Sequence, residues 1–221
     1  METTMKRETS NRLETTRARL APLFLLASLA ACGGGGGDGP APAPAPTLPS
    51  IAPAVDLNDN HQVGTSFWPN GDTASGGQGA TVEGIPCGPM VEAYHIHSHL
   101  SILVDGQARS IPAAVGIVDT ATTDCHYEIH THDLSGKLHV EGPAPGTYTL
   151  GQLFAIWGQP LTRTNVAGIT GMPVEIFITE NNTVMRYEGD PKDIELKSHR
   201  HIAIQLGSAI SQVPFFTWSA N

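Results

Sequence analysis

The sequence predicts a β-rich α+β fold: an antiparallel sheet of several hairpins with one packed helix. Strands are indicated because apolar and polar residues alternate along several short segments, and turn residues separate these segments in pairs. The helix is indicated by apolar residues at positions 150, 153, 154 and 157, which share one helical face.

The longest predicted strand runs from Tyr94 to Val104 and ends at Asp105-Gly106, a hairpin turn signal. Turn residues also lie at Asp133 to Gly136 and at Glu180 to Thr183, where they separate two further pairs of strands. The remaining strands are expected over residues 107–111, 127–132, 137–141, 173–179, 184–187 and 199–206.

The predicted helix follows Thr149, whose hydroxyl is a suitable N-cap, and it ends at Gly158 and Pro160. Trp157 lies on its apolar stripe, so we expect this side chain in the core rather than in a substrate site.

The first 31 residues have the pattern of a bacterial lipoprotein signal peptide. Basic residues precede the apolar run from Leu20 to Ala31, which is too short to span a membrane as a helix. The run ends in Leu-Ala-Ala-Cys, which resembles a lipobox and predicts lipidation of Cys32. Gly33 replaces the aspartate that holds many such proteins at the inner membrane, so an outer membrane is favoured where one exists. The alternative is an ordinary secretory signal with a chance cysteine.

Residues 32–83 are expected to form the lipidated cysteine, a tether and a loop-rich lead-in. The tether is a run of glycines followed by alternating Pro and Ala, up to about Ser50. The lead-in from Ile51 is rich in Gly, Asp, Asn, Thr and Ser, and we expect partial order at most. Residues 84–221 then form a single His-rich domain.

The charge of the chain argues against nucleic acid as a partner. The net charge is −9 with neutral histidines, and it is more negative without the basic signal segment. Cations are compatible with such a surface. The partners expected are therefore a metal ion and, through the lipid on Cys32, a membrane.

The two remaining cysteines, Cys87 and Cys125, lie in the exported part of the chain, and a disulfide between them is the default. The alternative is that both thiolates bind a metal.

Histidines occupy alternate positions in three segments, two of which echo each other. Alternate side chains of a strand point to the same face, so each segment presents a row of imidazoles. A neutral imidazole is the commonest transition-metal ligand. The rows are His95, His97 and His99; His130 and His132; and His199 and His201.

The sequence therefore predicts a metal site that takes two ligands from one row and the rest from a neighbouring strand. If the echoed segments pair, His97 and His99 meet His130 and His132. The further candidates are His95, His139 and His199, with Asp133 or Glu141 as a ligand or as an orienting partner; His61 and His126 are left out. Histidines hydrogen-bonded without a metal remain the alternative.

Such a site suits zinc or copper above all. The function expected is an envelope-anchored lipoprotein that binds a divalent transition metal. One alternative is a metal-dependent enzyme, a hydrolase or an oxygenase-like protein, that uses an open metal position; its catalytic residues would be unknown. The other alternative is a structural envelope protein without metal. Nucleophile elbows, phosphate loops and dinucleotide fingerprints are absent from the sequence, and the cupin and carbonic anhydrase patterns do not fit it.

The chain resembles a family of uncharacterised secreted prokaryotic proteins rich in histidine. The similar motifs are His-x-His-x-His-Leu at residues 95–100 and His-Thr-His-Asp-x-Ser-Gly-x-x-His-x-Glu at residues 130–141. A Trp-Gly-containing helix, a Gly-Asp-Pro and a Leu-Lys-x-His follow at residues 150–158, 189–191 and 196–199. The resemblance covers about half of the chain and implies His199, rather than His201, as the functional member of the last pair. It implies no particular activity.

Overall fold

A computed structural model of the chain describes residues 47–58, 61–71 and 76–218. The predicted signal peptide, Cys32 and most of the tether lie outside these residues. Within the described part of the chain, no helix is long and apolar enough to cross a membrane.

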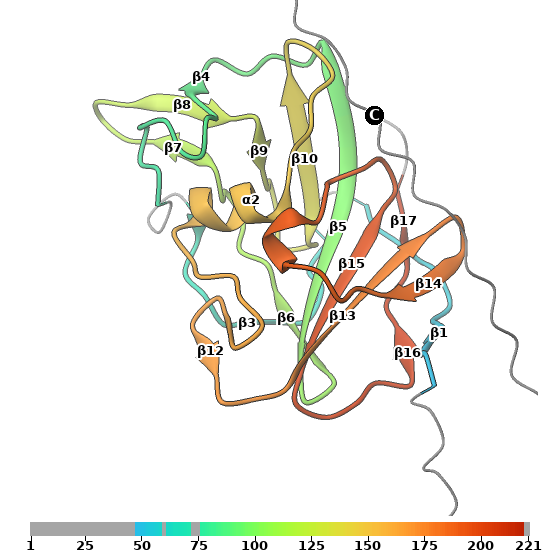
Figure 1. Cartoon of the computed structure of the whole chain (residues 1–221). Helices are drawn as coiled ribbons and strands as arrows, with labels where there is room; N and C mark the ends of the chain where they lie inside the picture. The colour runs from blue at the N-terminus through green and yellow to red at the C-terminus, as the bar shows by residue number, and fades with distance from the viewer. Residues whose placement is uncertain (1–46, 59–60, 72–75, 219–221) are drawn as a thin grey trace, which may run out of the picture. The chain divides into compact units, whose positions relative to one another are not determined.

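Among the described residues the largest sheet contains eight strands. Six of them follow the order β14-β13-β15-β5-β10-β9, while β6 pairs with the second half of β5 and β3 pairs with β6 (Figure 1). Their bounds are β3 Thr65–Ser66, β5 Tyr94–Val104, β6 Gln107–Ser110, β9 Ile129–His130, β10 Lys137–Gly142, β13 Val174–Glu180, β14 Thr183–Arg186 and β15 His201–Leu206. The sheet and its single described α-helix confirm the predicted β-rich α+β class.

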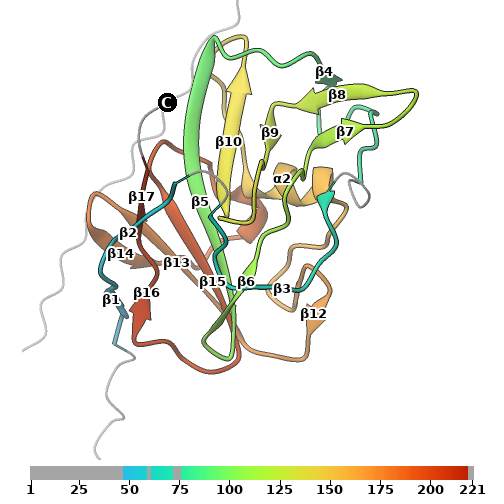
Figure 2. The same cartoon turned by 180° about the vertical axis from the view of Figure 1, so that it is seen from behind.

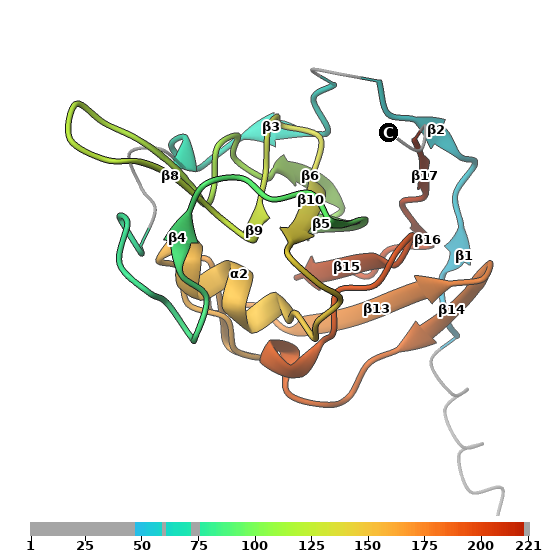
Figure 3. The same cartoon turned by 90° about the horizontal axis from the view of Figure 1, so that it is seen from above.

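Strand β5 crosses the centre of the sheet and is buried on both faces over most of its length. Its alternation sends Leu100 and Ile102 into the main apolar core with α2 (Leu150–Trp157). The histidines at odd positions lie on the opposite face. Seen from above, α2 lies on one side of the sheet and β17 (Phe216–Thr217) on the other (Figure 3).

One pairing at the centre of the sheet differs from the predicted antiparallel pattern. β15 lies parallel to β5, with His201 opposite His99. A parallel partner requires a long connection, and the chain between β5 and β15 includes the β13–β14 hairpin and the short 3-10 helix η1 (Pro191–Asp193). β15 also begins later than predicted, because His199 has a left-handed φ of 58° that ends extended backbone there.

Helix α2 has the predicted bounds, and its ends explain them. The Thr149 hydroxyl accepts from the Gln152 amide, while the Gln152 side chain accepts from the Thr149 amide, which forms a capping box. Gly158 ends the helix with a left-handed φ of 74°. Trp157 is fully buried in the core, as predicted.

The predicted strand at 127–132 is instead broken at Glu128 into β8 (Asp124–Tyr127) and β9. β8 turns away from the main sheet and pairs with β4 (Cys87–Gly88) and β7 (Ile117–Asp119) in a three-stranded sheet. Residues 165–170 form the short hairpin of β11 (Asn165–Val166) and β12 (Ile169–Thr170).

The described part of the lead-in is more ordered than predicted. β1 (Ser50–Ile51) pairs in parallel with β16 (Gln212–Val213), and β2 (Val55–Asp56) pairs in parallel with β17 (Figure 2). β3 joins the main sheet through β6. These ladders are only two residues long and are made by backbone groups, so the polar composition of the segment does not reveal them. The folded body therefore begins well before residue 84.

Candidate metal centre

The register of the main sheet places three histidines side by side across three strands. His97 of β5 lies opposite His139 of β10, and His139 lies opposite His130 of β9. The same register places His95 opposite Glu141. Neighbouring strands are about 4.8 Å apart, so imidazoles on the same face of such a row reach one another.

This register corrects the expected pairing of the two echoed segments. They do not pair with each other, because β10 lies between β5 and β9. The turn after His132 folds β10 back against β9 as its hairpin partner, and the other edge of β10 then pairs with β5. His139, which the sequence offered as a further candidate, is therefore at the centre of the cluster, and His99 is not.

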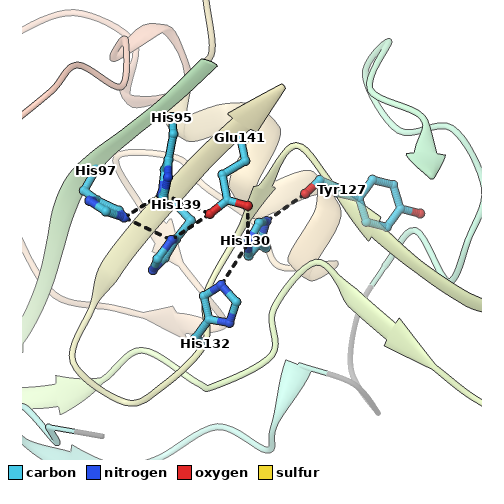
Figure 4. A network of polar contacts seen from close by, with 7 residues as sticks. All are labelled: His95, His97, Tyr127, His130, His132, His139 and Glu141. Atoms are coloured by element: carbon cyan, nitrogen blue, oxygen red, sulfur yellow. Dashed lines mark hydrogen bonds and ion pairs between the residues drawn. The ribbon is translucent and has the colours of Figure 1, made fainter. Parts of the chain in front are cut away.

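Four side-chain atoms of this cluster form a closed ring of short contacts (Figure 4). His95 Nε2 lies 2.9 Å from His97 Nε2, which lies 3.0 Å from His139 Nδ1. His139 Nδ1 lies 3.0 Å from Glu141 Oε1, and this oxygen lies 3.1 Å from His95 Nε2. We call these four residues the ring set. The three imidazole nitrogens of this set lie within 4.8 Å of one another, so they can hold one metal ion between them, with Glu141 Oε1 beside two of them.

Hydrogen bonds alone do not satisfy the ring set. Each facing nitrogen either carries a proton and donates, or offers a lone pair and accepts. If His95 and His139 both donate, each of them makes one bond. If His97 donates to one of these two rings, only the other ring can donate to the carboxylate, and again two bonds form. At most two of the four edges are therefore hydrogen bonds. A cation bound among the three imidazoles would use the lone pairs that these hydrogen bonds leave over, next to the negative charge of Glu141.

A second set of ligand atoms adjoins the ring set. His130 Nε2 lies 3.1 Å from His132 Nε2 and 3.6 Å from Glu141 Oε2. The other nitrogen of His130, Nδ1, lies 2.9 Å from the Tyr127 carbonyl oxygen and donates to it. This bond leaves a lone pair on His130 Nε2, which is how proteins commonly orient a histidine ligand. Two groups able to hold a metal ion result: His95, His97 and His139; and His130, His132, His139 and Glu141.

Their surroundings hold His97, His130 and Glu141 in the protonation state of metal ligands. Desolvation, with the charges of His139 and His95, lowers the pKa of His97 to about 3. Desolvation also lowers the pKa of His130 to about 4, although Glu141 opposes it. Burial alone would raise the pKa of Glu141, but the hydrogen bond from His139 and the charges of the surrounding histidines hold it at about 2. Neutral imidazoles around an ionised carboxylate are ready to bind a cation.

The other three histidines of the alternating rows lie outside both groups. His99 is buried, its Nε2 donates to the Ser135 carbonyl at 2.8 Å, and its ring stacks on Phe216 with centroids 4.1 Å apart. His201 Nε2 lies 2.9 Å from the Phe216 carbonyl oxygen. His199, the member that the family resemblance favours, is exposed, and its ring stacks on Trp218 at 5.2 Å. Of the residues left out, His126 has its ring 6.0 Å from that of His130, on the rim of the second set.

The segment after β16 covers this face of the sheet. Phe216 and Trp218 are buried in a small apolar cluster with Leu57 of the lead-in. The Trp218 ring lies 6.4 Å from the ring of His97. The sequence did not predict that Phe216 and Trp218 cover this face. A few aromatic residues near a C-terminus do not indicate the surface on which they pack.

A cavity of about 190 Å³ lies on the side of His130 and Glu141. Its wall includes residues of β8 and the segment around β4, which the predicted disulfide between Cys87 and Cys125 joins. The bridge therefore supports the wall of the cavity and supplies no metal ligand. The lining residues are Pro86, Gly88, Pro89, Met90, Val91, His126, Tyr127, Glu128, His130, Glu141 and Pro143.

Comparison of the chain with protein-family models, curated proteins and solved structures gives no match. The functional argument therefore depends on the geometry of the site.

Proposed function

We propose that this protein binds a divalent transition metal ion through the ring set, His95, His97, His139 and Glu141. The observation that carries the proposal is the closed ring of four ligand atoms with edges of 2.9 to 3.1 Å. Hydrogen bonding satisfies at most half of these contacts, whereas a cation would use the lone pairs that are left over. Three imidazoles and one carboxylate are a ligand set that zinc and copper accept, so these are the ions we propose.

We propose further that the protein acts at the cell envelope, anchored through a lipid on Cys32. The support is the sequence of the first 50 residues: a lipoprotein-like signal followed by a Gly-rich and Pro-Ala tether. Metal capture, buffering or presentation at the membrane surface is the role that this combination favours. We also propose membership of the His-rich secreted family, because its motifs at residues 95–100 and 130–141 contain the ring set.

The test is metal titration of the chelator-stripped protein, without an affinity tag, monitored by elemental analysis and by competition with a chromophoric chelator. We expect tight stoichiometric binding of zinc or copper. His97→Ala should abolish tight binding at the ring set. The matched control is His61→Ala, because His61 lies in the lead-in, outside both metal-binding groups. Absence of stoichiometric binding by the unaltered domain would contradict the proposal.

A second candidate function is supported by the cavity of about 190 Å³ beside His130 and Glu141. Binding and structural sites need no such space, whereas a metal-dependent enzyme needs room for a substrate next to the ion. The walls from Pro86 to Val91 are largely apolar, so a substrate would be small and partly apolar. Hydrolysis of chromogenic esters by the metal-loaded domain, compared with the metal-free domain, distinguishes a hydrolase from a binding protein.

A further inference from the structure

The two oxygens of Glu141 have different surroundings, although both belong to a buried carboxylate. Oε1 closes the ring set with His95 and His139. Oε2 is buried and has no hydrogen-bond partner among the described residues, and His130 Nε2 lies 3.6 Å from it. A buried carboxylate oxygen without a donor is costly, because its lost hydration is not replaced.

The imidazoles beside this oxygen cannot supply the missing hydrogen bond without breaking another. His130 Nδ1 donates to the Tyr127 carbonyl, so the neutral ring has only a lone pair on Nε2. His132 Nε2 lies 3.1 Å from the same nitrogen. Atoms of His130, His132 and Glu141 that can each offer a lone pair to a cation thus lie together on the side of the carboxylate that faces away from the ring set (Figure 4).

We propose that a second divalent ion binds to His130 Nε2, His132 Nε2 and Glu141 Oε2, and that the Glu141 carboxylate bridges it to the ion of the ring set. This inference rests on the proposed function, because the first ion occupies the ring set. Bridging carboxylates hold two ions about 3.5 to 4 Å apart in known two-metal sites. His139 lies between the two sets, its ring 4.3 Å from that of His97 and 4.4 Å from that of His132.

The second position differs from the first in its access to solvent. His132 is exposed, whereas His97, His139 and Glu141 are buried. The cavity also reaches His130 and Glu141, so this ion has open coordination positions toward the cavity. The carboxylate of Asp133 is close enough to His132 to interact with it electrostatically, and Glu128 lines the cavity. Both carboxylates add negative charge near the second ion. The second ion should therefore bind more weakly and exchange faster than the first.

The experiment counts ions and measures their coupling. The metal-free domain is titrated with Zn²⁺ for stoichiometry and with Cu²⁺ for electron paramagnetic resonance. We expect two ions per chain, with the second bound at least tenfold more weakly, and a copper spectrum broadened by coupling when both positions are filled. The variant His132→Ala changes an exposed side chain, so folding should be preserved, and it should bind one ion with an uncoupled spectrum.

The outcomes separate this inference from the proposed function. One ion per chain in the unaltered domain, with no change in His132→Ala, overturns the second site and leaves the ring set standing. No tight ion at all overturns both. Two ions that persist in His132→Ala, or two ions without spectral coupling, overturn the bridge. His199→Ala serves as the matched control, because His199 is also exposed but lies outside both groups.

Discussion

The face of β5 that points away from α2 carries histidines of two groups, and the two groups differ in what surrounds their ring nitrogens. At its first half, His95 and His97 face His139 and Glu141, and their nitrogens approach one another. At its second half, His99 faces His201 of β15, but the two rings stack with centroids 5.8 Å apart instead of directing nitrogens at a common point. The β5 members of both groups, His95, His97 and His99, are the same residue type on the same face of that strand.

The difference lies in what occupies the ring nitrogens. Backbone groups of Ser135 and Phe216 take one nitrogen each of His99 and His201, and aromatic rings cover the faces. In the ring set the facing nitrogens have mainly one another and a carboxylate as partners. A row of histidines therefore becomes a candidate metal site only where the neighbouring strand adds ligands and the backbone leaves the nitrogens free.

The largest effect should come from exchanging one histidine of each group for alanine. His139→Ala removes the residue shared by both candidate metal-binding groups, and we expect metal affinity to fall by at least about 100-fold. His201→Ala should change affinity less than about threefold but destabilise the fold by about 1 to 3 kcal/mol, because it empties a buried site. Metal competition and urea unfolding of both variants are the measurements. Equal losses of affinity would show that the two groups are not distinct.

Reduction of the disulfide tests the cavity side of the site. The bridge joins residues 38 positions apart, and its loss should destabilise the protein by about 3 to 4 kcal/mol on the chain-entropy estimate. The bridge joins Cys87 of β4 to Cys125 of β8, and none of the proposed histidine ligands belongs to these two strands. We therefore expect a lower melting temperature in reductant and unchanged metal stoichiometry at a temperature where the protein is folded. A gain of bound metal on reduction would instead indicate thiolate ligands.

Acidification should destabilise the metal-free protein. The folded-state pKa is about 3 for His97 and His99 and about 4 for His130, lowered in each case chiefly by burial, whereas an unfolded histidine has a pKa of about 6.5. The unfolded chain therefore takes up more protons below about pH 6.5, and stability falls as the pH drops toward 4. The slope should be on the order of 1 kcal/mol per pH unit for each buried histidine.

Urea unfolding of the metal-free protein at pH 7.5, 6.5 and 5.5 measures this slope. The fully buried His99 offers a matched variant, since His99→Gln removes one titrating group without altering the metal-binding groups. Its slope should be shallower than that of the unaltered protein. Stability that stays constant between pH 7.5 and 5.5 would show that the folded and unfolded chains take up protons equally, so that burial does not lower the pKa values of these histidines.

Local patterns predicted the local structure well. The alternation in β5 and the apolar stripe of α2 gave the observed bounds of both elements, because each pattern is set by neighbours within one segment. The disulfide was predicted because two cysteines in an exported chain have few alternatives.

The order of the strands was not predictable in this way. The echo between the histidine segments suggested that they pair, but a hairpin turn inserted β10 between them and made His139 central. His99 is kept out of the cluster by its hydrogen bond to the Ser135 carbonyl and by its stacking on Phe216. Phe216 is more than a hundred residues away in the sequence. Alternate positions within a strand determine which face of the sheet a histidine lies on. Whether several histidine nitrogens meet at one point depends on the register between strands and on contacts with backbone groups.

The smallest effect should come from His199, where the family resemblance and the geometry disagree. His199→Ala should change metal affinity less than about twofold, because the side chain is exposed and stacks on Trp218 outside both metal-binding groups. Its backbone amide donates to the His97 carbonyl at 2.8 Å, and alanine retains this bond. The φ of 58° makes alanine slightly strained, so His199→Asn, which tolerates this conformation better, is the control. A tenfold loss of affinity in both variants, measured by chelator competition, would place His199 in the metal site. The segment after β16, which carries Trp218, would then be part of that site as well.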